Sequence, residues 1–133
     1  MTYFDLYQSG ELLNRVREAY LRLAACDLCP HDCGVNRLKD ERGICGAGLK
    51  PKIASANVHK GEEPPISGTR GSGTIFLSGC SLRCRFCQNF PISQLGNGEE
   101  ITTAALAGRM LKLQRLGVHN INFVTPTHFL PQI

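Results

Sequence analysis

Residues 74–87 read TIFLSGCSLRCRFC, and this stretch decides most of what can be predicted about the fold. Residues 74–77 are a short apolar, partly β-branched run that follows a glycine-rich turn, which is typical of a buried strand. Three cysteines then follow with the spacing C-x3-C-x2-C. This order predicts a loop that carries three thiols at the carboxyl end of a buried strand.

The sequence that follows predicts a helix and a second strand. Residues 103–116 place Leu106 and Leu113 on one apolar face, and Thr102 is the expected N-cap residue. Residues 121–124 are a second short strand, which Thr-Pro-Thr ends. Strand, helix and strand in this order form a βαβ unit, whose two strands run parallel and whose crossover is right-handed.

The chain divides into three parts. Residues 1–50 begin with an amphipathic helix over residues 10–24 and continue as a cysteine-rich module with little periodicity. Residues 51–73 are a connector rich in glycine and proline, with a short strand over residues 52–58. Residues 74–133 carry the βαβ unit.

The composition favours metal or redox chemistry in the cytoplasm. The chain has seven cysteines, an odd number, and its N-terminus lacks the features of a secretory signal. Because cytosolic thiols are kept reduced, a disulfide framework is a poor fit. No apolar run is long enough to span a membrane. The net charge of +4 is scattered, so we expect neither nucleic acid nor a membrane as a main partner.

The thiols of Cys80, Cys84 and Cys87 suit a metal site with one open position. Structural zinc sites are closed by four protein ligands, and no fourth cysteine or histidine lies nearby in the sequence. Iron–sulfur cubanes are also usually held by four thiolates, so a cubane on three would leave one iron free to bind a substrate. The alternatives are a zinc site that borrows His128 and three buried thiols without a metal.

The cysteine loop resembles the C-x3-C-x-Φ-C signature of radical S-adenosylmethionine (SAM) enzymes, with Phe86 as the aromatic residue Φ. Further segments resemble an uncharacterised branch related to pyruvate formate-lyase activating enzymes. These segments are Cys29-Pro-His-Asp-Cys33, residues 63–68, residues 70–73, Cys87-Gln-Asn89 and Val124-Thr-Pro-Thr-His128. The resemblance runs from about residue 26 to the end of the chain.

The resemblance implies a radical SAM enzyme. Cys80, Cys84 and Cys87 would ligate a [4Fe-4S] cluster whose open iron binds SAM, and reductive cleavage of SAM would give methionine and a 5′-deoxyadenosyl radical. Phe86 would lie against the adenine side of SAM, and His128 would approach the ligand. The implied partners are an electron donor, such as flavodoxin or ferredoxin, and a protein substrate on which a glycyl radical is formed.

Two observations concern the surroundings of this cluster. Arg83 and Arg85 place two cations beside an anionic cluster, which would ease its reduction, although a solvated loop face is an equal alternative. The second strand ends in Thr-Pro-Thr at residues 125–127, where this superfamily usually has Gly-Gly-Glu. The resemblance therefore does not imply a contact between SAM and residues 125–127.

A second group has four cysteines with the spacing C-x2-C-x3-C-x11-C: Cys26, Cys29, Cys33 and Cys45. Four thiols match the count of a closed structural site, which would hold zinc or an auxiliary iron–sulfur cluster. His31 could replace one of the cysteines. Reduced thiols without a metal are the alternative.

These expectations combine into an α/β fold, the N-terminal part of a radical SAM partial (β/α) barrel preceded by a small metal-binding module. Because a full barrel needs about 200 residues or more, we expect the 133-residue chain to belong to a longer protein and to be inactive by itself. The rival functions are a non-catalytic zinc or iron–sulfur binding module and an inactive, truncated remnant.

Overall fold

The structure is a computed structural model that describes residues 2–133. Its strands are β1 (Lys52–His59), β2 (Ser72–Leu77), β3 (Glu99–Glu100) and β4 (Ile121–Val124). Its α-helices are α1 (Tyr3–Gln8), α2 (Glu11–Leu21), α3 (Pro64–Ser67), α4 (Phe90–Ser93) and α5 (Thr103–Arg115). The 3₁₀ turns are η1 (Arg22–Ala25), η2 (Arg37–Lys39) and η3 (Thr127–Gln132).

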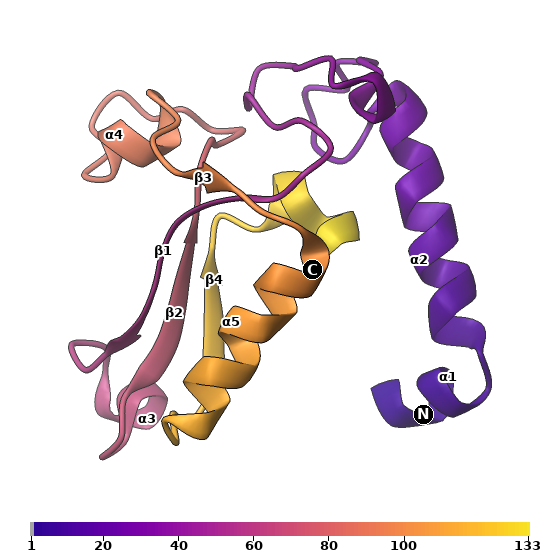
Figure 1. The fold of residues 1–133 in the computed structure, drawn as a ribbon. Coiled ribbons are helices and arrows are strands. Elements are labelled where there is room, and N and C mark those ends of the chain that lie inside the picture. The colour runs from indigo at the N-terminus through magenta and orange to yellow at the C-terminus, as the bar shows by residue number, and fades with distance from the viewer. Residues whose placement is uncertain (1) are drawn as a thin grey trace.

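The four strands form one mixed sheet in the order β3-β1-β2-β4 (Figure 1). β2 and β4 run parallel, with Gly73 opposite Ile121 and Phe76 opposite Val124. β1 lies antiparallel to both β2 and β3. The parallel pairing is therefore confined to the β2–β4 edge of this sheet.

The prediction of a partial (β/α) barrel is wrong, because the chain forms a small α/β fold around a four-stranded mixed sheet. The strands of such a barrel all run parallel, and each is joined to the next by a crossover helix. Here residues 60–71, which include α3, turn the chain back, so that β1 and β2 pair antiparallel. The segment 51–73, expected to be a connector, thus contributes an inner strand of the sheet.

The predicted parallel strand pair is present. The strands expected over residues 74–77 and 121–124 lie within β2 and β4, which pair in parallel. Helix α5 begins where predicted, since the Thr102 hydroxyl accepts a hydrogen bond from the Ala105 N–H at 3.1 Å. The parallel pairing brings the carboxyl ends of β2 and β4 to the same edge of the sheet.

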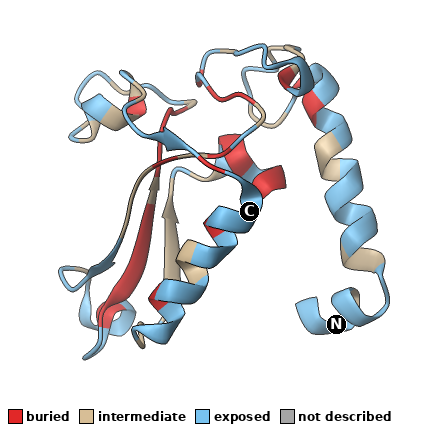
Figure 2. Ribbon diagram, viewed as in Figure 1, coloured by how far each residue is buried: buried red, intermediate tan, exposed pale blue. Residues whose placement is uncertain are grey.

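The hydrophobic core lies between α5 and one face of the sheet (Figure 2). Ile53, Ile75 and Leu77 of the sheet and Leu106 and Leu113 of α5 are at most 3% exposed. Burial of a side chain of this size stabilises a fold by about 1.5–3 kcal/mol. This packing fixes the carboxyl ends of β2 and β4 relative to each other.

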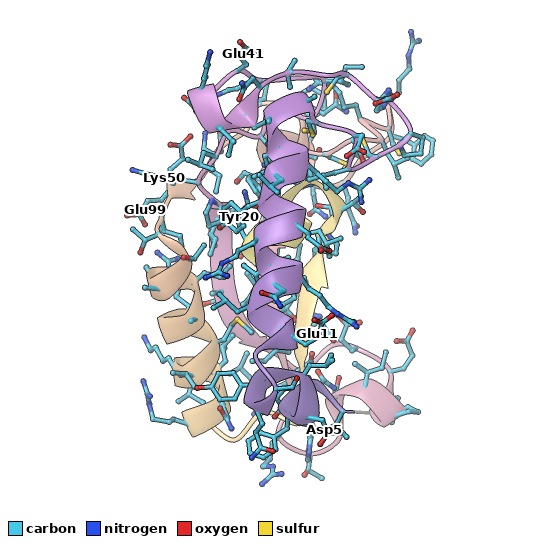
Figure 3. The ribbon with its side chains drawn as sticks, turned by 90° about the vertical axis from the view of Figure 1, so that its right-hand side faces the viewer. Asp5, Glu11, Tyr20, Glu41, Lys50 and Glu99 are labelled. Carbon is cyan, nitrogen blue, oxygen red and sulfur yellow. The ribbon has the colours of Figure 1, made fainter. Side chains whose placement is uncertain are left out.

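The helix predicted over residues 10–24 is present as α2 followed by η1, and a short helix that was not predicted, α1, precedes it. Thr2 and Asp5 form a capping box that starts α1, and Gly10, at φ +75°, separates α1 from α2. In Figure 3, α2 stands in front of the sheet, and Figure 1 shows that it lies apart from α5. No helix within residues 2–133 has the length and apolar character that crossing a membrane requires.

Candidate metal centres

The triad loop, residues 78–89, joins β2 to α4 and carries three of the cysteines (Figure 1). Cys80, three residues beyond the end of β2, is 6% exposed, whereas Cys84 and Cys87 are half-buried. The predicted position of the three thiols, on a loop at the carboxyl end of a buried strand, is therefore what the structure shows. One thiol lies inside the protein, and two lie closer to the surface.

Helix α4 holds the far end of the triad loop. The Cys87 N–H donates to the Cys84 carbonyl at 3.2 Å, so these two cysteines share one turn. The side chain of Gln94 donates to the same carbonyl at 2.7 Å. The Ser93 hydroxyl donates to the Cys87 sulfur at 3.3 Å, and this contact orients the sulfur.

The side chains expected to surround the cofactor, Phe86, Arg83 and Arg85, differ in exposure and in their hydrogen bonds. Phe86 is 91% exposed, so its ring is free to face a ligand. Arg85 is also exposed, whereas Arg83 donates from Nη1 to the Ile44 carbonyl at 3.1 Å. One of the two cations thus ties the triad loop to the cysteine-rich module.

His128 follows β4 and is only 2% exposed. Its Nε2 lies 2.9 Å from the Ser78 carbonyl, and since a carbonyl only accepts, this nitrogen donates. Burial lowers the pKa of His128, which favours the neutral imidazole. The ring therefore bridges the carboxyl ends of β2 and β4, and it is enclosed by protein instead of facing solvent.

One pocket, here called the four-thiol pocket, is lined by all the N-terminal cysteines: Cys26, Cys29, Cys33 and Cys45. Cys26 and Cys45 are buried, and burial raises the pKa of the Cys45 thiol. The backbone draws the chain together here, because Cys26 exchanges hydrogen bonds with Gly34 and Val35 at 3.1 and 3.0 Å. His31 and His128 also line the pocket.

Arg37 lines the same pocket, and no pattern in the sequence singles it out. Its side chain is 1% exposed. The guanidinium donates to the Gly48 carbonyl at 2.7 and 3.0 Å and to the His128 carbonyl at 2.6 Å. It also lies 4.0 Å from the Cys26 sulfur and 5.5 Å from the centre of the Phe129 ring.

The charge of Arg37 has no acidic partner in the described part of the chain. The ion pairs within residues 2–133 involve other arginines and one histidine, so no carboxylate pairs with the Arg37 guanidinium. An arginine is ordinarily a surface residue. Its burial depends on contacts with Gly48 and His128 that the sequence does not reveal.

The two cysteine groups lie side by side, although they are far apart in the sequence. His31 donates from Nε2 to the Ser81 carbonyl, 50 residues away, at 2.7 Å. Gly79, at φ +81°, passes so close to Cys45 that an added Cβ atom would clash with the Cys45 carbonyl oxygen. These contacts join the four-thiol pocket to the first turn of the triad loop.

A polar pocket opens between the two groups. Its lining includes Arg42, Lys52, Arg83, Gln94 and Glu100. Arg42 donates to Glu100 at 2.7 Å. The pocket thus presents both signs of charge beside the triad loop.

The thiols of neither group are drawn together into a ligand set. Within residues 2–133, no three side chains of histidine, cysteine, aspartate or glutamate are placed so that they could hold a metal ion. Metal binding by either group therefore requires its thiols to move toward the metal. The donor types fit soft metals, because thiolates bind both zinc and iron–sulfur clusters.

The comparisons with known proteins give a relative without an assigned activity. Over 106 residues the chain is 36% identical to Uncharacterized protein MJ0674 of Methanocaldococcus jannaschii. The match covers 74% of this chain and 30% of that protein, so the chain spans less than a third of its relative's length. No family model and no solved structure matches the chain.

Proposed function

We propose that the protein is a radical SAM enzyme whose [4Fe-4S] cluster is held by Cys80, Cys84 and Cys87. The observation that carries the proposal is the C-x3-C-x2-C spacing on a short loop at the carboxyl end of β2. Ligands of open α/β sheets bind outside the carboxyl ends of strands. The triad loop occupies such a position beside the end of β4.

The exposure of the three cysteines supports a cluster that also meets a ligand. Cys80 is anchored in the protein, whereas Cys84 and Cys87 are half-buried. Three thiolates leave one iron of a cubane without a protein ligand, because such clusters ordinarily take four. That open position would bind SAM, and the cluster would supply the electron that cleaves SAM into methionine and a 5′-deoxyadenosyl radical.

Residues around the triad loop would bind and orient these groups. The Ser93 hydroxyl donates to the Cys87 sulfur, a type of hydrogen bond that tunes iron–sulfur centres. Phe86 would lie against the adenine ring of SAM. The open iron would chelate the amino and carboxylate groups of SAM.

The proposal extends to partners and place of action. A low-potential electron carrier, such as flavodoxin or ferredoxin, would reduce the cluster in the cytoplasm. The exposed Arg85 beside the loop would favour the reduced, more negative cluster. The substrate would be a protein that acquires a glycyl radical, as the resemblance to activating enzymes implies.

The test is electron paramagnetic resonance of the anaerobically reconstituted, reduced chain with and without SAM. We expect a cluster signal that changes when SAM is added, because SAM binds the open iron. Cys84→Ala should lose the signal and about four irons per chain. Ser81→Ala, in the same loop, is the matched control and should keep both. The radical SAM assignment would be ruled out by a cluster signal that does not change when SAM is added, or by a signal that persists in Cys84→Ala.

A further inference from the structure

We propose that the four-thiol pocket binds a single Zn²⁺ ion through Cys26, Cys29, Cys33 and Cys45, and that Arg37 balances the negative charge of this centre. The inference rests on the pocket and on Arg37, and it is independent of the triad loop. It assigns the four N-terminal cysteines to a closed structural site.

Arg37 is the observation that points to an anion. Burying a charge costs much free energy unless the charge is both hydrogen-bonded and paired with an opposite charge. The guanidinium is 1% exposed, and its oxygen partners are the neutral carbonyls of Gly48 and His128. No carboxylate among residues 2–133 pairs with it. The charge of Arg37 therefore calls for another anion in the same pocket.

The cysteines are the groups that can supply this negative charge. All four line the pocket that Arg37 also lines, and the Arg37 Nη1 atom lies 4.0 Å from the Cys26 sulfur. Four thiolates around a divalent ion carry a net negative charge, which a neighbouring cation offsets. Bound metal and buried arginine thus stabilise each other.

The size of the pocket favours one ion over a cluster. Its free space is about 10 Å³, which is room for about one water molecule. A single ion needs less added space than a cubane of eight atoms, so the thiols would move less to bind the ion. Four protein ligands also complete the tetrahedral coordination of zinc and leave no open position.

Backbone contacts hold two of the four ligand residues, Cys26 and Cys33, near each other. Cys26 is hydrogen-bonded to Gly34, the neighbour of Cys33, at 3.1 Å. Gly43 packs so closely on Cys33 that an added Cβ atom would lie 2.5 Å from its sulfur. Zinc binding would therefore require the thiols to move toward the ion, while the hydrogen bond between Cys26 and Gly34 stays in place.

The experiment uses the full chain with Cys80→Ala, Cys84→Ala and Cys87→Ala, so that only the four N-terminal thiols remain. We expect this variant to bind about one Zn²⁺ per chain. Cobalt in place of zinc should give the intense visible absorption of a tetrahedral thiolate site. No tightly bound zinc in the folded variant, or an iron–sulfur chromophore in place of it, would overturn the proposal.

Arg37 is tested by comparing Arg37→Met with Lys39→Met in the same background. Lys39 is exposed, so its replacement should leave metal affinity unchanged. Replacement of Arg37 should weaken cobalt and zinc binding about 10- to 100-fold, as loss of an outer partner of a metal site does. Equal affinities of the two variants would contradict the role of Arg37.

A second measurement keeps the proposal testable if Arg37→Met does not fold. In the variant that retains Arg37 and lacks the triad cysteines, bound zinc should protect all four thiols from alkylation, and a chelator should expose them. Mass spectrometry of the alkylated chain counts the protected thiols. Equal alkylation with and without zinc would overturn the site.

Discussion

The four-thiol pocket and the triad loop differ in how the protein surrounds their sulfur atoms. The pocket has two buried cysteines and a buried arginine, Arg37, among its walls. The triad loop has one buried cysteine and, next to Cys87, the 91% exposed Phe86. Each group also has two half-buried cysteines, so the difference lies in the buried Arg37 beside one group and the exposed Phe86 beside the other, which suits structural binding and ligand binding respectively.

The largest expected effect is a difference in the free energy of unfolding between variants of the four-thiol pocket and variants of the triad loop. Cys29→Ala should remove much of the stabilisation by bound zinc, which is about 10 kcal/mol or more in small zinc modules. Cys84→Ala should affect the free energy of unfolding far less, because its loop is open to solvent on one side. Urea unfolding of both metal-loaded variants measures the difference. Equal losses of stability would break the comparison.

The next largest loss of stability is expected where the triad loop packs against Cys45 of the four-thiol pocket. Gly79→Ala introduces a Cβ at φ +81°, where it clashes with the Cys45 carbonyl oxygen. The backbone strain costs about 1–2 kcal/mol, and the overpacking adds about 1–3 kcal/mol. Thermal or urea unfolding measures this loss.

Gly96→Ala is the control for Gly79→Ala. Gly96 also has a positive φ, +69°, but an added Cβ would meet only the end of the Lys52 side chain, at 3.9 Å. Its cost should therefore be the backbone strain alone. If both variants lose the same stability, the close approach of Gly79 to Cys45 does not join the two regions.

A smaller effect is expected at His31. His31→Ala removes the hydrogen bond to the Ser81 carbonyl, which should lower the free energy of unfolding by about 0.5–1.5 kcal/mol. Hydrogen exchange of the amides in residues 79–84 should become faster. His59→Ala, an exposed histidine on β1, should leave those amides unchanged. Unchanged exchange in His31→Ala would show that the contact does not hold the triad loop.

The smallest effect on stability is expected at Phe86. Because the ring is 91% exposed, Phe86→Ala should change the free energy of unfolding by less than about 0.5 kcal/mol. Stacking on a base is worth about 1–3 kcal/mol, so the SAM concentration needed to change the cluster signal should rise about tenfold. Leu82→Ala, with a side chain 78% exposed in the same loop, should not shift it. Identical SAM titrations of the two variants would show that Phe86 does not contact SAM.

Features that depend on local sequence could be predicted. Thr102 caps α5 through the Ala105 N–H three residues on, and an apolar stripe three or four residues apart marks the buried face of that helix. The position of Cys80, Cys84 and Cys87 after a buried strand also follows from neighbouring residues. These features depend on residues that are neighbours in the chain, so a single sequence is enough to predict them.

Features that depend on long-range pairing could not be predicted. The sequence predicts a strand over residues 52–58, but the antiparallel register of β1 with β2 is set by the turn over residues 60–71 and by tertiary packing. The burial of Arg37 depends on the carbonyl of His128, 91 residues away. The same holds for the contact of His31 with Ser81, which places the two cysteine groups together.

The most direct test of the division between the two regions is the metal content of two proteins reconstituted with both iron and zinc. These are the unaltered chain and the variant with Cys80→Ala, Cys84→Ala and Cys87→Ala. We predict that the variant loses about four irons and keeps about one zinc per chain. Iron that stays in the variant, or zinc that leaves together with the iron, would contradict the division into an open iron–sulfur site and a closed zinc site.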